Sequence, residues 1–133
     1  MYRKHLQHPE FESFFLPFGG HLDSDNRWVR MAKLIPWAEV EQRYEKLFAD
    51  SVMGAPAKNV RIALGALIIK ELLGLSDEET VEQIREKPYL QYFLAYESCR
   101  GEAPFEASMM VRFRKRLGIE DLNWVQEKIA QRA

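Results

Sequence analysis

The apolar stretch at residues 60–73 constrains the fold more than any other part of the sequence. Its apolar residues are interrupted by one glycine and by three charged residues that do not share a helical face: Arg61, Gly65, Lys70 and Glu71. A helix that is apolar nearly all round belongs in the centre of a bundle. A glycine costs about 1 kcal/mol relative to alanine inside a helix. We therefore expect Gly65 to permit a close approach of a neighbouring helix.

Helical periodicity continues through most of the chain from Ser24 onward. The expected segments are 24–35, 36–48, 58–73, 76–87, 88–96, 108–117 and about 120–132. Their boundaries carry local signals, namely N-cap candidates at 24–26, Gly74 as a left-handed C-cap, the capping-box pair Ser76 and Glu79, Ser108 as an N-cap and Gly118 as a stop. We find no period-two segment and no internal repeat. The predicted fold class is therefore all-α, a compact multi-helix bundle.

The length of 133 residues favours one domain with or without an appended arm. We expect residues 1–23 to form an N-terminal arm and residues 24–133 the helical domain. The arm is rich in aromatic residues at 11–18 and broken by Pro17 and the pair Gly19–Gly20. It either packs on the domain or binds a partner. No apolar run approaches the roughly 18 residues of a membrane span, so no membrane association is expected.

Catalytic and metal-binding patterns are not found in the sequence. The three histidines and the single cysteine, Cys99, lack the spacing of a zinc site. There is no glycine-rich phosphate loop. The acidic groups at 77–79 and 120–121 lie at predicted helix starts, where carboxylates interact favourably with the helix dipole. We therefore predict no catalytic residue and no cofactor in this chain, and a lone cysteine is typical of a reducing cytoplasm.

Residues 64–84 form a predicted helix, a turn containing Gly74 and a second helix, the order found in helix-turn-helix proteins. Residues 76–97 contain six acids and two bases, a net charge of −4 that would repel phosphate. Two interpretations stay open: a structural hairpin, or DNA contact through the helix ends. In the second, Arg85 and Lys87 would make the contact.

The predicted helix at 108–117 carries a basic face. Met110, Phe113 and Leu117 form its buried stripe, and four cations lie elsewhere around it: Arg112 and Lys115 point directly away, and Arg114 and Arg116 lie on the flanks. Residues 99–118 have a net charge of +3. Clustered cations of this kind bind phosphate, although cations also favour a helix C-terminus for its dipole alone.

Five stretches of the sequence together resemble a known protein family. They are Leu34-Ile-Pro-Trp37, Gly65-Ala-Leu-Ile-Ile-Lys70, Leu75-Ser-Asp-Glu-Glu-Thr-Val-Glu-Gln-Ile84, Pro88-Tyr-Leu-Gln-Tyr-Phe93 and Phe113-Arg-Lys-Arg-Leu-Gly118. In this order and spacing, across about residues 28–130, the sequence resembles the N-terminal domain of bacterial insertion-sequence transposases of the InsH-like kind. The resemblance implies a helical domain that engages the element's terminal DNA. It also implies a following RNase H-like catalytic domain, whose two Asp and one Glu hold divalent metal.

We therefore predict a DNA-binding and positioning domain that recognises double-stranded element ends and is not catalytic on its own. The expected phosphate contacts are Arg112, Lys115 and Arg116, with Arg114 as a base reader and Arg85 and Lys87 as secondary contacts. The alternative is a dimerisation or synapsis module that forms a homodimer. We expect the catalytic domain and its metal to lie outside this chain. The expected location is the bacterial cytoplasm, at the nucleoid.

Overall fold

A computed structural model of the chain describes residues 20–49, 60–96 and 101–132. Within these ranges it contains seven helices: α1 (Arg27–Leu34), α2 (Trp37–Ala49), α3 (Val60–Leu73), α4 (Asp77–Glu86), α5 (Pro88–Phe93), α6 (Met109–Arg116) and α7 (Ile119–Arg132). The same ranges contain no strand. The predicted all-α fold class is therefore confirmed. Residues 1–19 of the predicted arm lie outside the described residues.

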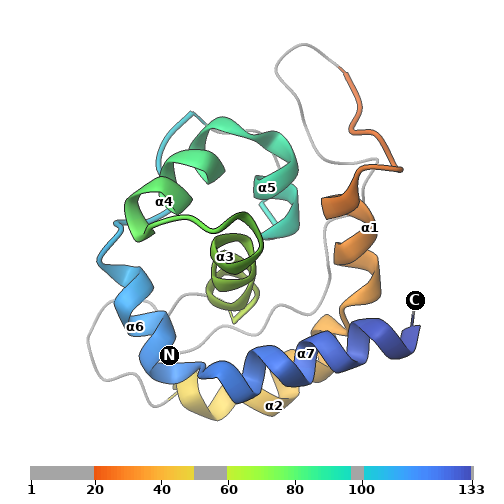
Figure 1. The fold of residues 1–133 in the computed structure, drawn as a ribbon, viewed down its shortest axis with the longest axis vertical. Helices are drawn as coiled ribbons and strands as arrows, with labels where there is room; N and C mark the ends of the chain where they lie inside the picture. The colour runs from red at the N-terminus through yellow and green to blue at the C-terminus, as the bar shows by residue number, and fades with distance from the viewer. Residues whose placement is uncertain (1–19, 50–59, 97–100, 133) are drawn as a thin grey trace.

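The central helix of the bundle is α3, which Figure 1 shows nearly end-on with the other helices around it. It packs against α2, α4 and α6, and its residues between Val60 and Ile69 are buried except for Ile62. A Cβ atom on Gly65 would overlap Leu94 Cδ2 and would lie 3.6 Å from the Phe93 ring. The structure thus confirms both the central position of α3 and the close approach at Gly65.

Most helix boundaries follow the predicted local signals. The Asn26 side chain caps α1 by accepting a hydrogen bond from the backbone N–H of Trp28 at 2.8 Å. The backbone of Gly74, which follows α3, has a positive φ of 63°. Ser76 and Glu79 form a reciprocal capping box, with hydrogen bonds of 3.1 Å and 2.9 Å. These three features confirm the predicted starts of α1 and α4 and the predicted end of α3.

The start of α6 differs from the prediction. Ser108 precedes the first helical residue, but its own backbone is already helical (φ −60°, ψ −23°) and its side chain makes no capping hydrogen bond. An N-cap side chain reaches the first turn from an extended backbone, so the predicted cap at Ser108 was wrong. Backbone turns lead into the helix instead: the N–H of Met109 donates to Glu106 O and that of Met110 to Ala107 O.

One arginine lies inside the core, which the sequence analysis did not predict. Arg61 is 1% exposed, and its guanidinium donates to Phe93 O at 2.8 Å and to Tyr92 O at 3.1 Å. The same group lies 4.6 Å from the centre of the Trp37 ring. Burial lowers the pKa of Arg61 to about 10, while the charges of Tyr92 and Glu41 act in the opposite direction. Arg61 therefore stays charged at neutral pH and holds the end of α5 against α3.

Three aromatic rings join α1, α2 and α5. The Trp28 and Trp37 rings lie edge-on to Phe93, with ring centres 5.2 Å and 5.8 Å away. All three side chains are buried. Edge-on aromatic pairs stabilise by about 0.5–1.5 kcal/mol beyond the area that they bury. This cluster fixes α1 and α2 on the side of the bundle next to α5.

The hairpin predicted at 64–84 corresponds to α3, the Gly74 turn and α4, and the two helices pack together. Its likeness to a DNA-reading helix-turn-helix stays a prediction.

Before α1, Leu22 is buried and the backbone N–H of Asp23 donates to the Tyr89 hydroxyl at 2.9 Å. The last residues of the predicted arm therefore lie on the helical domain. In the described part of the chain, no helix has the length and apolar character needed to cross a bilayer.

Candidate nucleic-acid interface

Helix α6 is fixed by one apolar stripe. Met110, Phe113 and Leu117 are 0%, 2% and 2% exposed, and α6 packs against α3. The Phe105 ring lies edge-on to Phe113 with ring centres 5.2 Å apart. The predicted buried stripe is confirmed. The opposite side of α6 faces outward, and we call its four cations, Arg112, Arg114, Lys115 and Arg116, the basic face.

The outermost cations of the basic face are Arg112 and Lys115, whose side chains are exposed. They are three residues apart, so they are neighbours on the helix surface. Among the residues that the structure describes, no ion pair or hydrogen bond holds either side chain. Arg116 is half-buried and already interacts within the protein. Two positive charges of the basic face are thus open to an external anion.

Arg114 has a partner inside the protein. Its guanidinium makes two hydrogen bonds to the carboxylate of Asp77, of 2.6 Å and 3.1 Å, across 37 residues of sequence. The hydrogen bond from Arg114 lowers the pKa of Asp77, and the same bond raises the pKa of Arg114. Arg114 must leave Asp77 before it can offer these two donors to a base, and its predicted base-reading role stays a prediction.

The secondary candidates lie at the other end of α4. Arg85 pairs with Glu82 at 2.8 Å and donates to Gly101 O at 3.3 Å, and this pairing with Glu82 raises the pKa of Arg85. Lys87 is exposed at the junction of α4 and α5. At about 1.5 Å per residue, Arg85 lies about 12 Å and Lys87 about 15 Å along the helix axis from Asp77. The structure therefore does not gather Arg85 and Lys87 with the basic face.

Two of the acidic residues at the helix starts, Glu79 and Asp121, act as caps, as predicted. Glu79 accepts from the backbone N–H of Ser76 at 2.9 Å, and Asp121 accepts from that of Gly118 at 2.8 Å. The hydrogen bonds with Ser76 lower the pKa of Glu79. In the three described ranges no group of three or more His, Cys, Asp or Glu could hold a metal ion. Cys99 lies outside those ranges.

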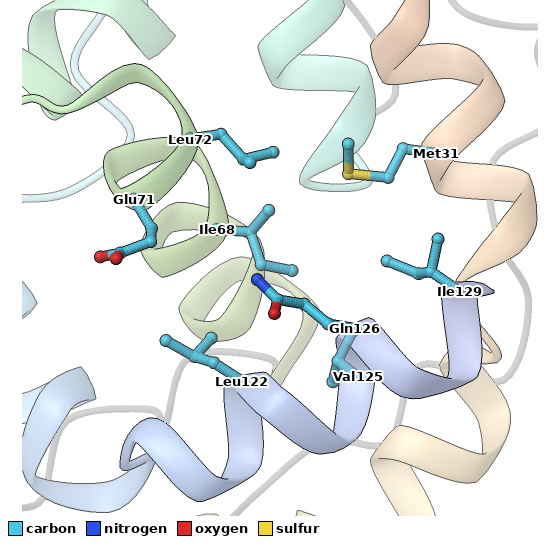
Figure 2. A pocket seen from close by; sticks show the side chains of 8 residues that line it. All are labelled: Met31, Ile68, Glu71, Leu72, Leu122, Val125, Gln126 and Ile129. Atoms are coloured by element: carbon cyan, nitrogen blue, oxygen red, sulfur yellow. The ribbon is translucent and has the colours of Figure 1, made fainter.

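An apolar pocket of about 100 Å³ lies between α1, α3 and α7, and the sequence analysis did not predict it. Figure 2 shows the side chains that line it: Met31, Ile68, Glu71, Leu72, Leu122, Val125, Gln126 and Ile129. Leu72 is 48% exposed. The apolar spacing along α7 was visible in the sequence, but its partner helices were not. The pocket suits an apolar side chain rather than a charged group.

Known proteins resemble this chain over most of its length. The transposase domain family (DUF772) matches residues 17–116, which include the whole basic face. An uncharacterized protein of Rhizobium meliloti, ORF8 in the nfe locus, is 39% identical over 94 residues, which cover 71% of this chain and 44% of that protein. The chain thus spans less than half the length of that relative. No solved structure gives a significant match. The family match extends over most of the 133 residues, and the chain belongs to the transposase domain family (DUF772).

Proposed function

We propose that this chain is the DNA-binding and positioning domain of an insertion-sequence transposase and is not catalytic on its own. Its target is the double-stranded DNA at the ends of the element, which places it at the bacterial nucleoid. Membership of the transposase domain family supports the general assignment. The observation that carries the DNA contact is the pair Arg112 and Lys115, two exposed cations with no carboxylate partner among the described residues.

Phosphate binding is the physical basis of the proposed contact. Each cation that neutralises a phosphate releases condensed counterions, so the logarithm of the binding constant falls with the logarithm of salt concentration by about 0.9 per contact. A cation that is already paired gains less from the exchange. Arg112 and Lys115 pay no such cost, because no described carboxylate binds them. They are therefore the strongest phosphate contacts of the basic face, and Arg116 contributes less.

The charge of α4 limits how DNA can approach. Its first turn carries Asp77, Glu78 and Glu79, and phosphates next to that turn would be repelled. The proposed contact therefore runs through α6, and α4 does not enter the groove by its N-terminal end. Arg85 and Lys87, at the far end of α4, would contact phosphate only where the duplex extends past α6.

Salt-dependent binding of a duplex tests the proposal. The variant Arg112→Gln/Lys115→Gln keeps an unbranched polar side chain at each position and removes both charges. We expect its salt slope to be smaller than that of the wild type by about 1.8, which is two phosphate contacts. The matched control is Arg30→Gln/Arg132→Gln, which removes two exposed cations outside α6. The proposal is wrong if the wild type does not bind duplex at about 50 mM salt. It is also wrong if the two double variants reduce the salt slope by the same amount relative to the wild type.

Recognition of element ends needs a separate readout. We expect selection from a random-sequence duplex library to enrich one motif, and that motif to occur at both ends of the element that carries the gene. The substitution Arg114→Gln relaxes the motif at one or two positions if Arg114 reads a base. Enrichment of no motif would leave phosphate binding without end recognition, and would contradict this part of the proposal.

The alternative function is a dimerisation or synapsis module. The observation that favours it is the apolar pocket beside the exposed Leu72, because exposed apolar surface marks sites of protein contact. The predicted aromatic arm lies outside the described residues for the most part. Sedimentation of the chain with and without residues 1–23 separates the two functions. The alternative requires a dimer that is lost with the arm, whereas the proposed function requires DNA binding by the shortened chain.

A further inference from the structure

The carboxylate of Asp77 lies between cations from two other helices. It binds Arg114 of α6 through the two hydrogen bonds described above. Lys70 of α3 also approaches it, with Nζ 3.6 Å from Asp77 Oδ1, the oxygen that accepts the shorter of those bonds. Lys70 also donates to Leu75 O at 2.7 Å. We call the group of Asp77, Lys70 and Arg114 the clamp. It connects α3, α4 and α6 at the edge of the basic face.

The clamp occupies one pair of N–H donors that a phosphate would use, those on Nη1 and Nη2 of Arg114. A guanidinium binds a carboxylate and a phosphate through the same pair of parallel N–H donors. Arg114 cannot offer both donors to DNA while Asp77 accepts them. The side chains of Arg114 and Asp77 are 42% and 20% exposed, so an external anion can replace the carboxylate without unfolding. Arg114 and Lys70 also line a surface hollow of about 400 Å³, which leaves room for the exchange.

We propose that Asp77 sets the DNA affinity of the basic face by competing with phosphate for Arg114 and Lys70. This inference rests on the proposed function, because it names the residue that tunes the same interface. A purely structural role for Asp77 would be a surface ion pair, and such pairs contribute only about 0–1 kcal/mol to stability. Competition predicts a different outcome: removal of the carboxylate strengthens DNA binding.

The test compares Asp77→Asn with Glu78→Gln. Both variants remove one negative charge from the first turn of α4, but Glu78 does not contact Arg114. We expect Asp77→Asn to bind a random-sequence duplex about fivefold more tightly, the attraction of one added charge pair at contact distance in water. Its salt slope rises by about 0.9, so it loses about 3.5-fold more affinity than the wild type between about 50 and 200 mM salt. Glu78→Gln changes affinity less than twofold.

Two further variants assign the effect. Asp77→Ser is a second uncharged variant that suits a helix start, and circular dichroism checks that each variant folds. In the Arg114→Gln background, Asp77→Asn gives at most a small gain through Lys70, since the main cation of the clamp is gone. An equal gain in both backgrounds would show that Arg114 is not the group that Asp77 withholds.

The outcomes separate the two proposals. If the wild type binds duplex in a salt-dependent way and Asp77→Asn matches Glu78→Gln, the clamp inference is wrong and the proposed function stands. If neither the wild type nor Asp77→Asn binds, both are wrong. If only Asp77→Asn and Asp77→Ser bind, the clamp inference is supported, whereas the proposed function of the wild-type chain is wrong because the wild type does not bind duplex.

Discussion

Replacing the buried Arg61 by methionine tests whether one guanidinium holds the end of α5 in the core. Methionine is unbranched, shorter than arginine and uncharged. The substitution removes the hydrogen bonds that Arg61 donates to two buried carbonyl oxygens, those of Tyr92 and Phe93. It also removes the positive charge near Glu41, which is only 2% exposed. Tyr92 O still accepts from the backbone N–H of Ala95 at 2.9 Å. The variant therefore leaves Phe93 O and the Glu41 carboxylate poorly satisfied in the centre of the bundle.

The expected loss follows from these contacts. A buried acceptor that loses its donor costs about 1–3 kcal/mol, and this cost applies to Phe93 O, because Tyr92 O keeps the N–H of Ala95. Removing one partner from a buried charge pair costs about 3–5 kcal/mol in measured cases. Relief from burying the Arg61 charge acts in the opposite direction. We expect a net loss of about 3–5 kcal/mol in the free energy of unfolding, a large part of the 5–15 kcal/mol typical of a domain.

Urea denaturation followed by circular dichroism measures this loss. Arg61→Lys keeps a charge but lacks the planar pair of donors, so its free energy of unfolding lies between the values for the wild type and Arg61→Met. Arg30→Met is the control, because Arg30 is exposed and such changes stay within about 0.5 kcal/mol. A loss below about 1 kcal/mol for Arg61→Met would refute the reasoning, because it falls at the low end of the cost of even one unpaired carbonyl.

Two other predictions concern packing and pH. In Gly65→Ala the added methyl group overlaps Leu94, which lowers the free energy of unfolding by about 1–3 kcal/mol, while the better helix propensity of alanine returns about 1 kcal/mol. In a Leu94→Ala background the overlap is gone, so the same change raises the free energy of unfolding. A double-mutant cycle that shows no coupling between the two positions would contradict the contact. Burial, and then a hydrogen bond with Asp121, raise the pKa of Tyr44 to about 12 from 10.0. The folded state keeps a proton that the unfolded state loses, so this stabilisation is complete below pH 10 and disappears as pH rises through about 12. Tyr44→Phe reduces the fall in stability over this window, measured by denaturation at each pH, and an unchanged pH profile would argue against the shift.

The helix boundaries could be predicted because their signals are local. Asn26, Gly74 and the Ser76–Glu79 box act within one turn of the chain, so their roles do not depend on distant packing. Ser108 shows the limit of such signals. It has a suitable residue type at the right position, but the chain enters α6 through backbone turns in which its side chain has no capping role.

The candidate site was predictable only in part. The helical period alone orients Arg112 and Lys115 outward, and the structure agrees. The pairing of Arg114 with Asp77 joins residues 37 apart, and helix period and capping give no information on contacts over that distance. The burial of Arg61 could not be predicted for the same reason. On a helix that is apolar nearly all round, the helices packed against it decide which charged residue lies inside the core.

The apolar pocket was missed for the same reason. The spacing of Leu122, Val125 and Ile129 indicates one apolar face on α7, and each of these residues lines the pocket. The other walls come from Met31 on α1 and from α3. Sequence periodicity predicts that a face is apolar, but it does not show whether the facing helices fill the space next to it.

The contact surface of DNA on the folded chain tests the central claim most directly. Amide chemical shifts of the isotope-labelled chain, followed during titration with a duplex in low salt, report which helix the DNA touches. We expect the largest changes at residues 109–118 around Arg112 and Lys115, smaller changes at Asp77 as its carboxylate is displaced, and reversal of both when salt is added. Changes centred on α1 and α7, with α6 unaffected, would contradict this claim.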